Sequence, residues 1–182
     1  MIKSIEFTVD WRCFKIGDKI EFNPGINLLV GDQGSGKSSL IQEIVNHVNR
    51  RDIHSNLVHD TDLVHYYDFE KSNLRTKSYV DTLSDIKSRF VSHGEFNLNV
   101  VIGLASKEKD AVFLMDEPDT ALSIRSISVL VKTFAQMALN GCQVIAAVHN
   151  PYIIQALSVV CDMESRQWVM PKEFITKQLI DK

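Results

Sequence analysis

The chain has 182 residues, of which 45% are hydrophobic and 24% charged, and its formal net charge is −3 at pH 7. Its length and apolar content predict a single domain over residues 1–182, and the lack of an export signal or an apolar run near the roughly 20 residues that span a bilayer predicts a cytoplasmic chain with no membrane partner. The small negative charge gives no global attraction to nucleic acid, and the basic side chains within 71–89 fit a solvated helix face better than a binding patch.

Residues 2–22 alternate apolar and polar side chains on either side of a turn signal at positions 17–18. A period of two with a turn in the middle predicts an antiparallel β-hairpin at the N-terminus. After a second turn signal at 23–25, Ile26–Val30 is apolar enough for a buried strand that runs directly into Gly31. Apolar residues at helical spacing predict a helix over 38–50.

The second half of the chain alternates between the two kinds of element. Residues 51–62 are polar and have no period, whereas 63–69 are rich in β-branched and aromatic side chains and predict a short strand before a variable helical region. Helices are predicted over 95–107 and 123–139, and buried strands over 111–115 and 143–148. Strands that alternate with helices predict an α/β domain whose central sheet is mainly parallel.

Two features are expected to be structural. The widely spaced Cys13, Cys142 and Cys161 match neither a zinc pattern nor a disulfide framework, which favours buried, reduced thiols. The C-terminal segment 168–174 carries no chemistry of its own, and we expect it to pack against the sheet.

Residues 31–38 read Gly-Asp-Gln-Gly-Ser-Gly-Lys-Ser and match the phosphate-loop pattern G-x-x-x-x-G-K-[ST], between a predicted strand and a predicted helix. The glycines let successive backbone N–H groups turn toward one centre, and the start of the helix adds donors for phosphate oxygens. Lys37 is expected to contact the β- and γ-phosphates of ATP, and the Ser38 hydroxyl to bind Mg²⁺. The predicted nucleotide-binding residues of this segment are Gly31, Asp32, Gln33, Gly34, Ser35, Gly36, Lys37, Ser38 and Ser39.

Two adjacent acids, Asp116 and Glu117, end the apolar run at 112–115. Successive side chains of a strand point in opposite directions, so the two carboxylates can take different roles. Asp116 is expected to contact Mg²⁺ directly or through water, and Glu117 to polarise the attacking water. Acid pairs at strand ends are common in solvated turns, but the position of this pair after a phosphate loop favours catalysis.

Three further motifs occur in the chain: Ser-His-Gly-Glu at 92–95, before the acid pair, Asp-Thr-Ala-Leu-Ser at 119–123, just after it, and His149 after a predicted strand. With the phosphate loop and the acid pair, they resemble the ABC ATPase superfamily, particularly its soluble DNA-repair and chromosome-maintenance branch and the small stand-alone ATPases related to it. The resemblance covers most of the chain and implies a P-loop NTPase fold with a shortened helical region. It also implies that Ser92 and Gly94 bind the γ-phosphate of ATP held by an opposite subunit, that 119–123 cross a dimer interface, and that His149 contacts the γ-phosphate. Taken alone, Ser92 fits a helix cap and His149 a structural position.

The chain departs from this family in two ways. No glutamine lies between positions 42 and 136, so the family's Q-loop glutamine has no counterpart, and Asp68 or Glu70 could take its place. The segment between positions 37 and 92 is too short for a transporter-type helical subdomain, which disfavours a transporter nucleotide-binding subunit. The family's adenine contact has four candidates, and for the two large aromatic ones the hairpin core is an equal alternative. These candidates are Trp11, Arg12, Phe14 and Lys15.

From the resemblance we expect an ATPase that converts ATP and water to ADP and phosphate in an ATP-dependent, head-to-tail homodimer. Pairing and hydrolysis would power or switch an effector protein in DNA repair or defence, and DNA is a further candidate partner. The rival hypothesis is an interaction module whose dimerisation is controlled by the nucleotide and whose turnover is incidental.

Overall fold

The computed structural model describes residues 1–61, 63–69 and 93–180, with 93–97 described by their backbone alone. The described strands form two sheets, a small antiparallel sheet in the order β2-β1-β4 and a large sheet in the order β5-β6-β7-β3-β8-β9. The small sheet contains β1 (Ile2–Phe7), β2 (Lys19–Glu21) and β4 (Ser55–His59). The large sheet contains β3 (Ile26–Val30), β5 (Val64–Asp68), β6 (Val112–Asp116), β7 (Gln143–Ala147), β8 (Val160–Asp162) and β9 (Gln167–Val169). Neighbouring strands of this sheet are parallel, except that β8 and β9 pair in antiparallel fashion.

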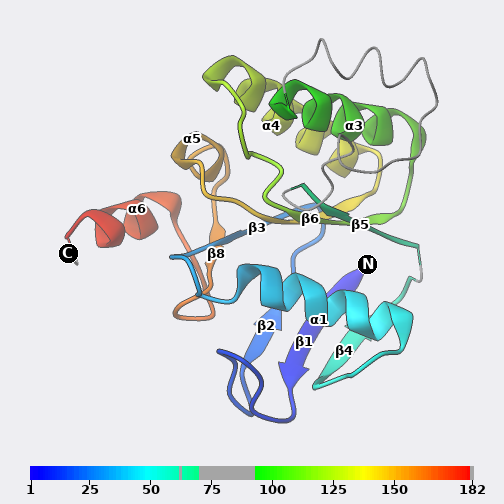
Figure 1. Cartoon of the computed structure of the whole chain (residues 1–182), viewed down its shortest axis with the longest axis vertical. Coiled ribbons are helices and arrows are strands. Elements are labelled where there is room, and N and C mark those ends of the chain that lie inside the picture. The colour runs from blue at the N-terminus through cyan, green and yellow to red at the C-terminus, as the bar shows by residue number, and fades with distance from the viewer. Residues whose placement is uncertain (62, 70–92, 181–182) are drawn as a thin grey trace.

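Helices cover both faces of the large sheet. Figure 1 shows α3 (His93–Lys107) and α4 (Ile124–Leu139) on one side, and α1 (Lys37–Asn49) with the small sheet on the other. Two short helices, α5 (Pro151–Ile154) and α6 (Pro171–Ile180), lie toward the β8 end. Because both faces are covered, the central strands are mostly apolar, and all five residues of β6 are buried, including Asp116 at its end.

The two faces of β6 pack into two separate clusters. Phe113 and Met115 join the side chains of α3 and α4, whereas Val112 and Leu114 join those of α1 and the small sheet. The alternation follows from the period of two in a strand. Helix α1 therefore packs on the same face of the large sheet as the small sheet, through Leu40, Ile41 and Ile44.

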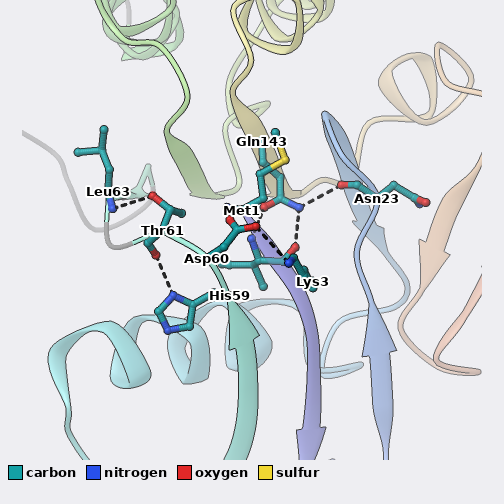
Figure 2. Close-up of polar contacts among 9 residues, drawn as sticks. Met1, Lys3, Asn23, His59, Asp60, Thr61, Leu63 and Gln143 are labelled. Atoms are coloured by element: carbon teal, nitrogen blue, oxygen red, sulfur yellow. Dashed lines mark hydrogen bonds and ion pairs between the residues drawn. The ribbon is translucent and has the colours of Figure 1, made fainter.

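The buried side chain of Gln143, at the start of β7, joins the two sheets (Figure 2). Its Oε1 accepts the N–H of Ile2 at 2.7 Å, and its Nε2 donates to the carbonyl oxygens of Ile2 at 2.8 Å and Asn23 at 3.0 Å. Nearby, the N-terminal ammonium and Lys3 both contact the carboxylate of Asp60. The Gln143 hydrogen bonds thus fix the antiparallel sheet against the central one, whereas the Asp60 contacts join β1 to the end of β4 within the small sheet.

The structure confirms the predicted α/β class, the mainly parallel sheet and the N-terminal hairpin, in which Ser4 pairs with Glu21 and Ile5 with Ile20. It also adds elements that no pattern predicted: β4 lies within the segment 51–62, and α5, β8, β9 and α6 follow the last predicted strand. The segment 168–174 packs as expected, since β9 extends the sheet and Phe174 of α6 is buried. The predicted variable helical region falls largely on residues 70–92, outside the described part.

The expectation of three buried thiols is wrong for Cys13, which is exposed, and correct for Cys142 and Cys161. Stacked rings of Phe7 and Phe14, with centroids 4.1 Å apart, fill the interior of the hairpin loop. The buried Phe14 ring occupies that interior, and the neighbouring Cys13 side chain lies at the surface beside Ser35.

Candidate active site

The phosphate loop connects the end of β3 to the start of α1. Its three glycines have positive φ angles, 143° at Gly31, 86° at Gly34 and 102° at Gly36, which side chains other than glycine rarely adopt. Helix α1 begins after Gly36 with no side-chain cap and no acidic residue in its first turn. Its first backbone N–H groups therefore have no internal acceptor, which is the arrangement that binds anions at helix N-termini.

Lys37 places its ammonium inside this loop. The residue is 5% exposed, and Nζ donates to the carbonyl oxygens of Gly31 at 2.7 Å and Asp32 at 2.9 Å. Burial lowers the pKa of Lys37, and the negative charges of Glu117 and Asp116, among others, oppose that shift. The loop thus holds a positive charge that lacks full solvation and that a phosphate oxygen can approach.

Ser38 and Asp116 meet at the end of β6. The Ser38 hydroxyl donates to Asp116 Oδ1 at 2.9 Å, and the Asp116 residue is only 7% exposed. A hydroxyl beside a carboxylate is an oxygen donor set that suits Mg²⁺. No group of three or more potential metal-ligating side chains occurs within 1–61, 63–69 and 93–180, so Mg²⁺ here would need phosphate and water oxygens as its remaining ligands.

Asp68, one candidate for the Q-loop position, lies beside Asp116. The two residues are direct partners in the parallel register of β5 and β6. Asp68 Oδ2 accepts the Tyr66 hydroxyl at 3.4 Å. Burial, followed by the charges of Asp68 and Asp116, raises the pKa of Tyr66, so its hydroxyl keeps its proton as a donor.

Glu117 and His149 extend from the neighbouring ends of β6 and β7. Glu117 has a left-handed backbone with φ 54°, which is uncommon for a non-glycine residue and typical of functional sites. Its Oε1 lies 3.3 Å from His149 Nε2, and both side chains are partly exposed, at 30% and 47%. The backbone N–H of Glu117 donates to Ala147 on β7 at 3.1 Å, which fixes the two strand ends to each other.

One cavity of about 240 Å³ collects these residues. Its lining comes from the phosphate loop, the start of α1 and the ends of β6 and β7, and comprises Gln33, Gly34, Gly36, Lys37, Ser38, Ser39, Glu117 and His149. Phosphate-binding donors and the two catalytic candidates therefore face the same space.

Asp119 links the loop after β6 to the segment that follows β7. Its Oδ2 accepts the backbone N–H of His149 at 2.9 Å and that of Asn150 at 2.7 Å. On the same loop, the Thr120 hydroxyl donates to Glu117 Oε2 at 3.2 Å. The segment predicted to cross a dimer interface thus also sets the positions of both catalytic candidates.

Several predicted residues are placed elsewhere or lie outside the description. Ser92 and Glu70 are outside the described residues, and Gly94 lies in the first turn of α3. Ser39 lines the cavity as predicted for a nucleotide-binding residue, and its hydroxyl accepts a hydrogen bond from Arg12 at 3.0 Å.

The four adenine candidates also have defined surroundings. Phe14 is fully buried, which favours its core alternative. The Trp11 ring stacks on His54 with ring centroids 5.0 Å apart. The Arg12 guanidinium lies over the same Trp11 ring, 4.5 Å from its centroid. Lys15 pairs with Asp10 at 2.8 Å. Of the four, Arg12 reaches the start of α1 through Ser39, and its guanidinium covers the Trp11 ring.

Two residues of the β8–β9 turn contact the phosphate loop and were not predicted. Glu164 Oε1 accepts the N–H of Asp32 at 3.3 Å, and Arg166 Nη1 donates to the carbonyl oxygen of Ser35 at 2.9 Å. The two strands have only three residues each, too few to show a period, and no motif marks the turn. The sequence therefore held no signal for these contacts.

Comparisons with known proteins agree with this geometry. A family model described as an AAA domain matches residues 10–46, and no curated protein matches the chain. Among solved structures, a chain from an inward-facing conformation of a protein assigned to the metal-chelate type ABC transporters is similar, with a TM-score of 0.65 and 16% identity over 96% of this chain and 85% of that one. The chain has an α/β P-loop NTPase fold. The predicted fold class is confirmed, and the matches support a P-loop ATPase.

Proposed function

We propose that this chain is an ABC-type ATPase that binds Mg-ATP and hydrolyses it to ADP and phosphate. The observation that supports it most is the single cavity shared by Lys37, Ser38, Glu117 and His149. Phosphate binding alone would not require a strand-end glutamate in a left-handed conformation beside a histidine.

Each side chain has a role that follows from its position. Lys37 and the first N–H groups of α1 bind the phosphates, and Ser38 and Asp116 would hold the metal. Mg²⁺, when bound, neutralises charge on the phosphate oxygens. Glu117 accepts a hydrogen bond from water and orients it toward the γ-phosphate, and His149 donates to the oxygens on which charge develops.

The proposed assembly is a head-to-tail homodimer in which Ser92 and Gly94 of each subunit close the site of the other. The partly exposed side chains of Glu117 and His149 leave the site open to such a partner. Loss of the γ-phosphate would remove the bond between subunits and release them. We place this cycle in the cytoplasm, where it would drive an effector in DNA repair or defence, with DNA as a further candidate partner. In the described part of the chain, no helix is long and apolar enough to cross a bilayer.

Glu117→Gln tests the hydrolytic role. The amide keeps the shape of the side chain but cannot polarise water, so phosphate release should fall by about 100-fold or more while ATP still binds. The wild type and the variant are compared by steady-state phosphate release and by calorimetric titration with Mg-ATP. Unchanged phosphate release in the folded variant would remove Glu117 from the mechanism.

Mixing two inactive variants tests the paired site. In Ser92→Arg the phosphate loop is intact, and in Lys37→Met the Ser92 segment is intact, so a head-to-tail heterodimer has one whole site. Partial recovery of ATPase activity on mixing is expected. If heterodimers form, as shown by differential tags, but remain inactive, each subunit carries its own complete site and the dimer model is wrong.

A second candidate function is a nucleotide-controlled interaction module with little turnover. The observation that favours it is that no glutamine lies between positions 42 and 136, whereas Asp68, one of the two candidates for the Q-loop position, places a carboxylate beside Asp116. ATP-dependent dimers in sedimentation, together with phosphate release no faster than in Glu117→Gln, would establish it. A transporter subunit is the weaker alternative, and a stable complex with a membrane permease would be needed to support it.

A further inference from the structure

The turn between β8 and β9 supports the phosphate loop from its outer side. Glu164 contacts the N–H of Asp32 near the beginning of the loop, and Arg166 contacts the carbonyl oxygen of Ser35 near its end. A backbone hydrogen bond fixes the start of the turn beside the loop, since the N–H of Met163 donates to the carbonyl oxygen of Val30 at 2.8 Å. A segment more than a hundred positions away in sequence thus reaches both halves of the loop.

The side chain of Arg166 is held on four sides. Its Nη1 donates to Ser35, its Nη2 donates to the carbonyl oxygen of Cys13 at 3.1 Å, and its Nε lies 3.5 Å from a carboxylate oxygen of Asp18. The guanidinium also lies 4.3 Å from the centroid of the Phe14 ring. Only 15% of this side chain is exposed, so its hydrogen bonds are poorly screened by solvent.

The contact with Ser35 has a consequence inside the loop. In a trans peptide the C=O and the following N–H point in opposite directions, so drawing the Ser35 carbonyl toward Arg166 turns the Gly36 N–H the other way. Arg166 lies on the hairpin side of the loop, with Cys13 and Phe14, whereas Gly36 also lines the phosphate cavity. The Gly36 N–H is therefore directed toward the space where phosphate oxygens would bind.

We propose that Arg166 is a positioning residue for phosphate binding, which acts by fixing the Ser35–Gly36 peptide so that its N–H faces the nucleotide. This proposal rests on the proposed function. Arg166 touches no reacting atom, and the guanidinium acts through backbone geometry alone. Loss of the contact leaves the Ser35 carbonyl with the weak thiol donor of Cys13, at 3.6 Å, so this peptide can rotate, and ordering it again lowers nucleotide affinity.

The turn does not depend on Arg166 for its own shape. Asp162 accepts the N–H of Glu164 at 3.0 Å and the hydroxyl of Ser165 at 2.9 Å, and Lys177 contacts the same carboxylate at 3.3 Å. Arg166 has a left-handed backbone with φ 59°, which asparagine tolerates better than most residues. Arg166→Asn should therefore keep the turn and remove the contact, whereas Ser165→Ala removes a hydrogen bond of the turn and keeps the contact.

The experiment compares Mg-ADP and Mg-ATP binding by calorimetry in the wild type, Arg166→Asn and Ser165→Ala, with thermal unfolding of each. We expect at least about a tenfold loss of affinity for both nucleotides in Arg166→Asn and less than about threefold in Ser165→Ala. The amide resonance of Gly36 provides an independent measure. On addition of Mg-ADP it should move downfield and exchange more slowly in the wild type, and much less so in Arg166→Asn at saturating nucleotide.

Equal affinities in the wild type and a folded Arg166→Asn would overturn the proposal, as would equal losses in both variants, because the shape of the turn and not the contact would then matter. If Arg166→Asn does not fold, Arg166→Gly replaces it, since glycine adopts this φ freely. A wild-type chain that binds neither nucleotide would instead refute the proposed function, so the two failures can be told apart.

Discussion

Replacing Lys37 with methionine should separate nucleotide binding from stability. Methionine keeps most of the side-chain volume and removes the ammonium that donates to Gly31 and Asp32. In the unliganded protein, the loss of two hydrogen bonds is offset by relief of the cost of burying the charge. We therefore expect the free energy of unfolding to change by less than about 1 kcal/mol.

Binding should respond far more strongly. If the ammonium contacts the β- and γ-phosphates, two charge-assisted hydrogen bonds of about 1.5–3 kcal/mol each are lost, which corresponds to about 150- to 20,000-fold in affinity. Calorimetric titration with Mg-ATP measures this, with urea unfolding as the stability control. Lys132→Met, at an exposed position on α4, is the matched control and should bind like the wild type. A folded Lys37→Met protein within about threefold of wild-type affinity would refute the assignment of the phosphate loop.

The pH dependence gives a second test of the same residue. Because burial lowers the pKa of Lys37 below its ordinary 10.5, the folded chain loses this proton at a lower pH than the unfolded chain. The destabilising effect of Lys37 is complete below the lowered pKa and is relieved as pH rises from there toward 10.5. Phosphate needs the ammonium form, so Mg-ATP affinity should fall over the same window in the wild type. Lys37→Met should lack both the gain in stability and this fall in affinity.

Three other changes test separate parts of the structure. Asp119→Ala removes the acceptor of two backbone N–H groups and should lower stability by about 2–4 kcal/mol in urea unfolding and also reduce phosphate release, whereas a loss of stability with full activity would contradict the positioning of His149. Gln143→Met leaves the buried N–H and C=O of Ile2 without their partner and should cost about 3 kcal/mol, and a loss under about 1 kcal/mol would show that this contact does not join the sheets. Exposed Cys13 should react with a thiol reagent in the native protein, whereas Cys142 and Cys161 should react only on unfolding, because both are buried and the pKa of Cys161 is raised to about 12; prompt labelling of all three would mean that the native sheet opens readily.

The parts of the site that could be predicted are those in which local sequence determines local structure. A strand buried on both faces is a nearly continuous apolar run, so β3, β6 and β7 were recognisable without their neighbours although each contains one polar residue. The phosphate loop follows from glycines at positive φ and a helix start, both of which are encoded within eight residues. The proximity of Ser38 and Asp116 then follows, since parallel strands end at one edge of a sheet.

The elements that could not be predicted depend on distant partners. Strand β4 has only one buried residue, Ser55, and its pairing with β1 is supported by Glu43 of α1, whose buried carboxylate accepts from Ser55 and from the backbone of His54. Strands β8 and β9 are too short for a period and form because the edge of β3 is open to them. Sequence patterns therefore predict whether a residue is buried more reliably than they predict which strand or side chain it contacts.

The relative position of Glu117 and His149 also depends on distant partners and could not be predicted from local sequence. The left-handed backbone at Glu117 costs about 1–3 kcal/mol and persists only where surrounding contacts determine it. Those contacts are the bond from Glu117 N–H to Ala147 and the carboxylate of Asp119, which holds the backbone of His149. The position of the glutamate and that of the histidine are thus set by one interlocked pair of strand ends. A substitution that relaxes either end should therefore move both side chains, so variants at Asp119 and at Glu117 should be less than additive in their effect on hydrolysis.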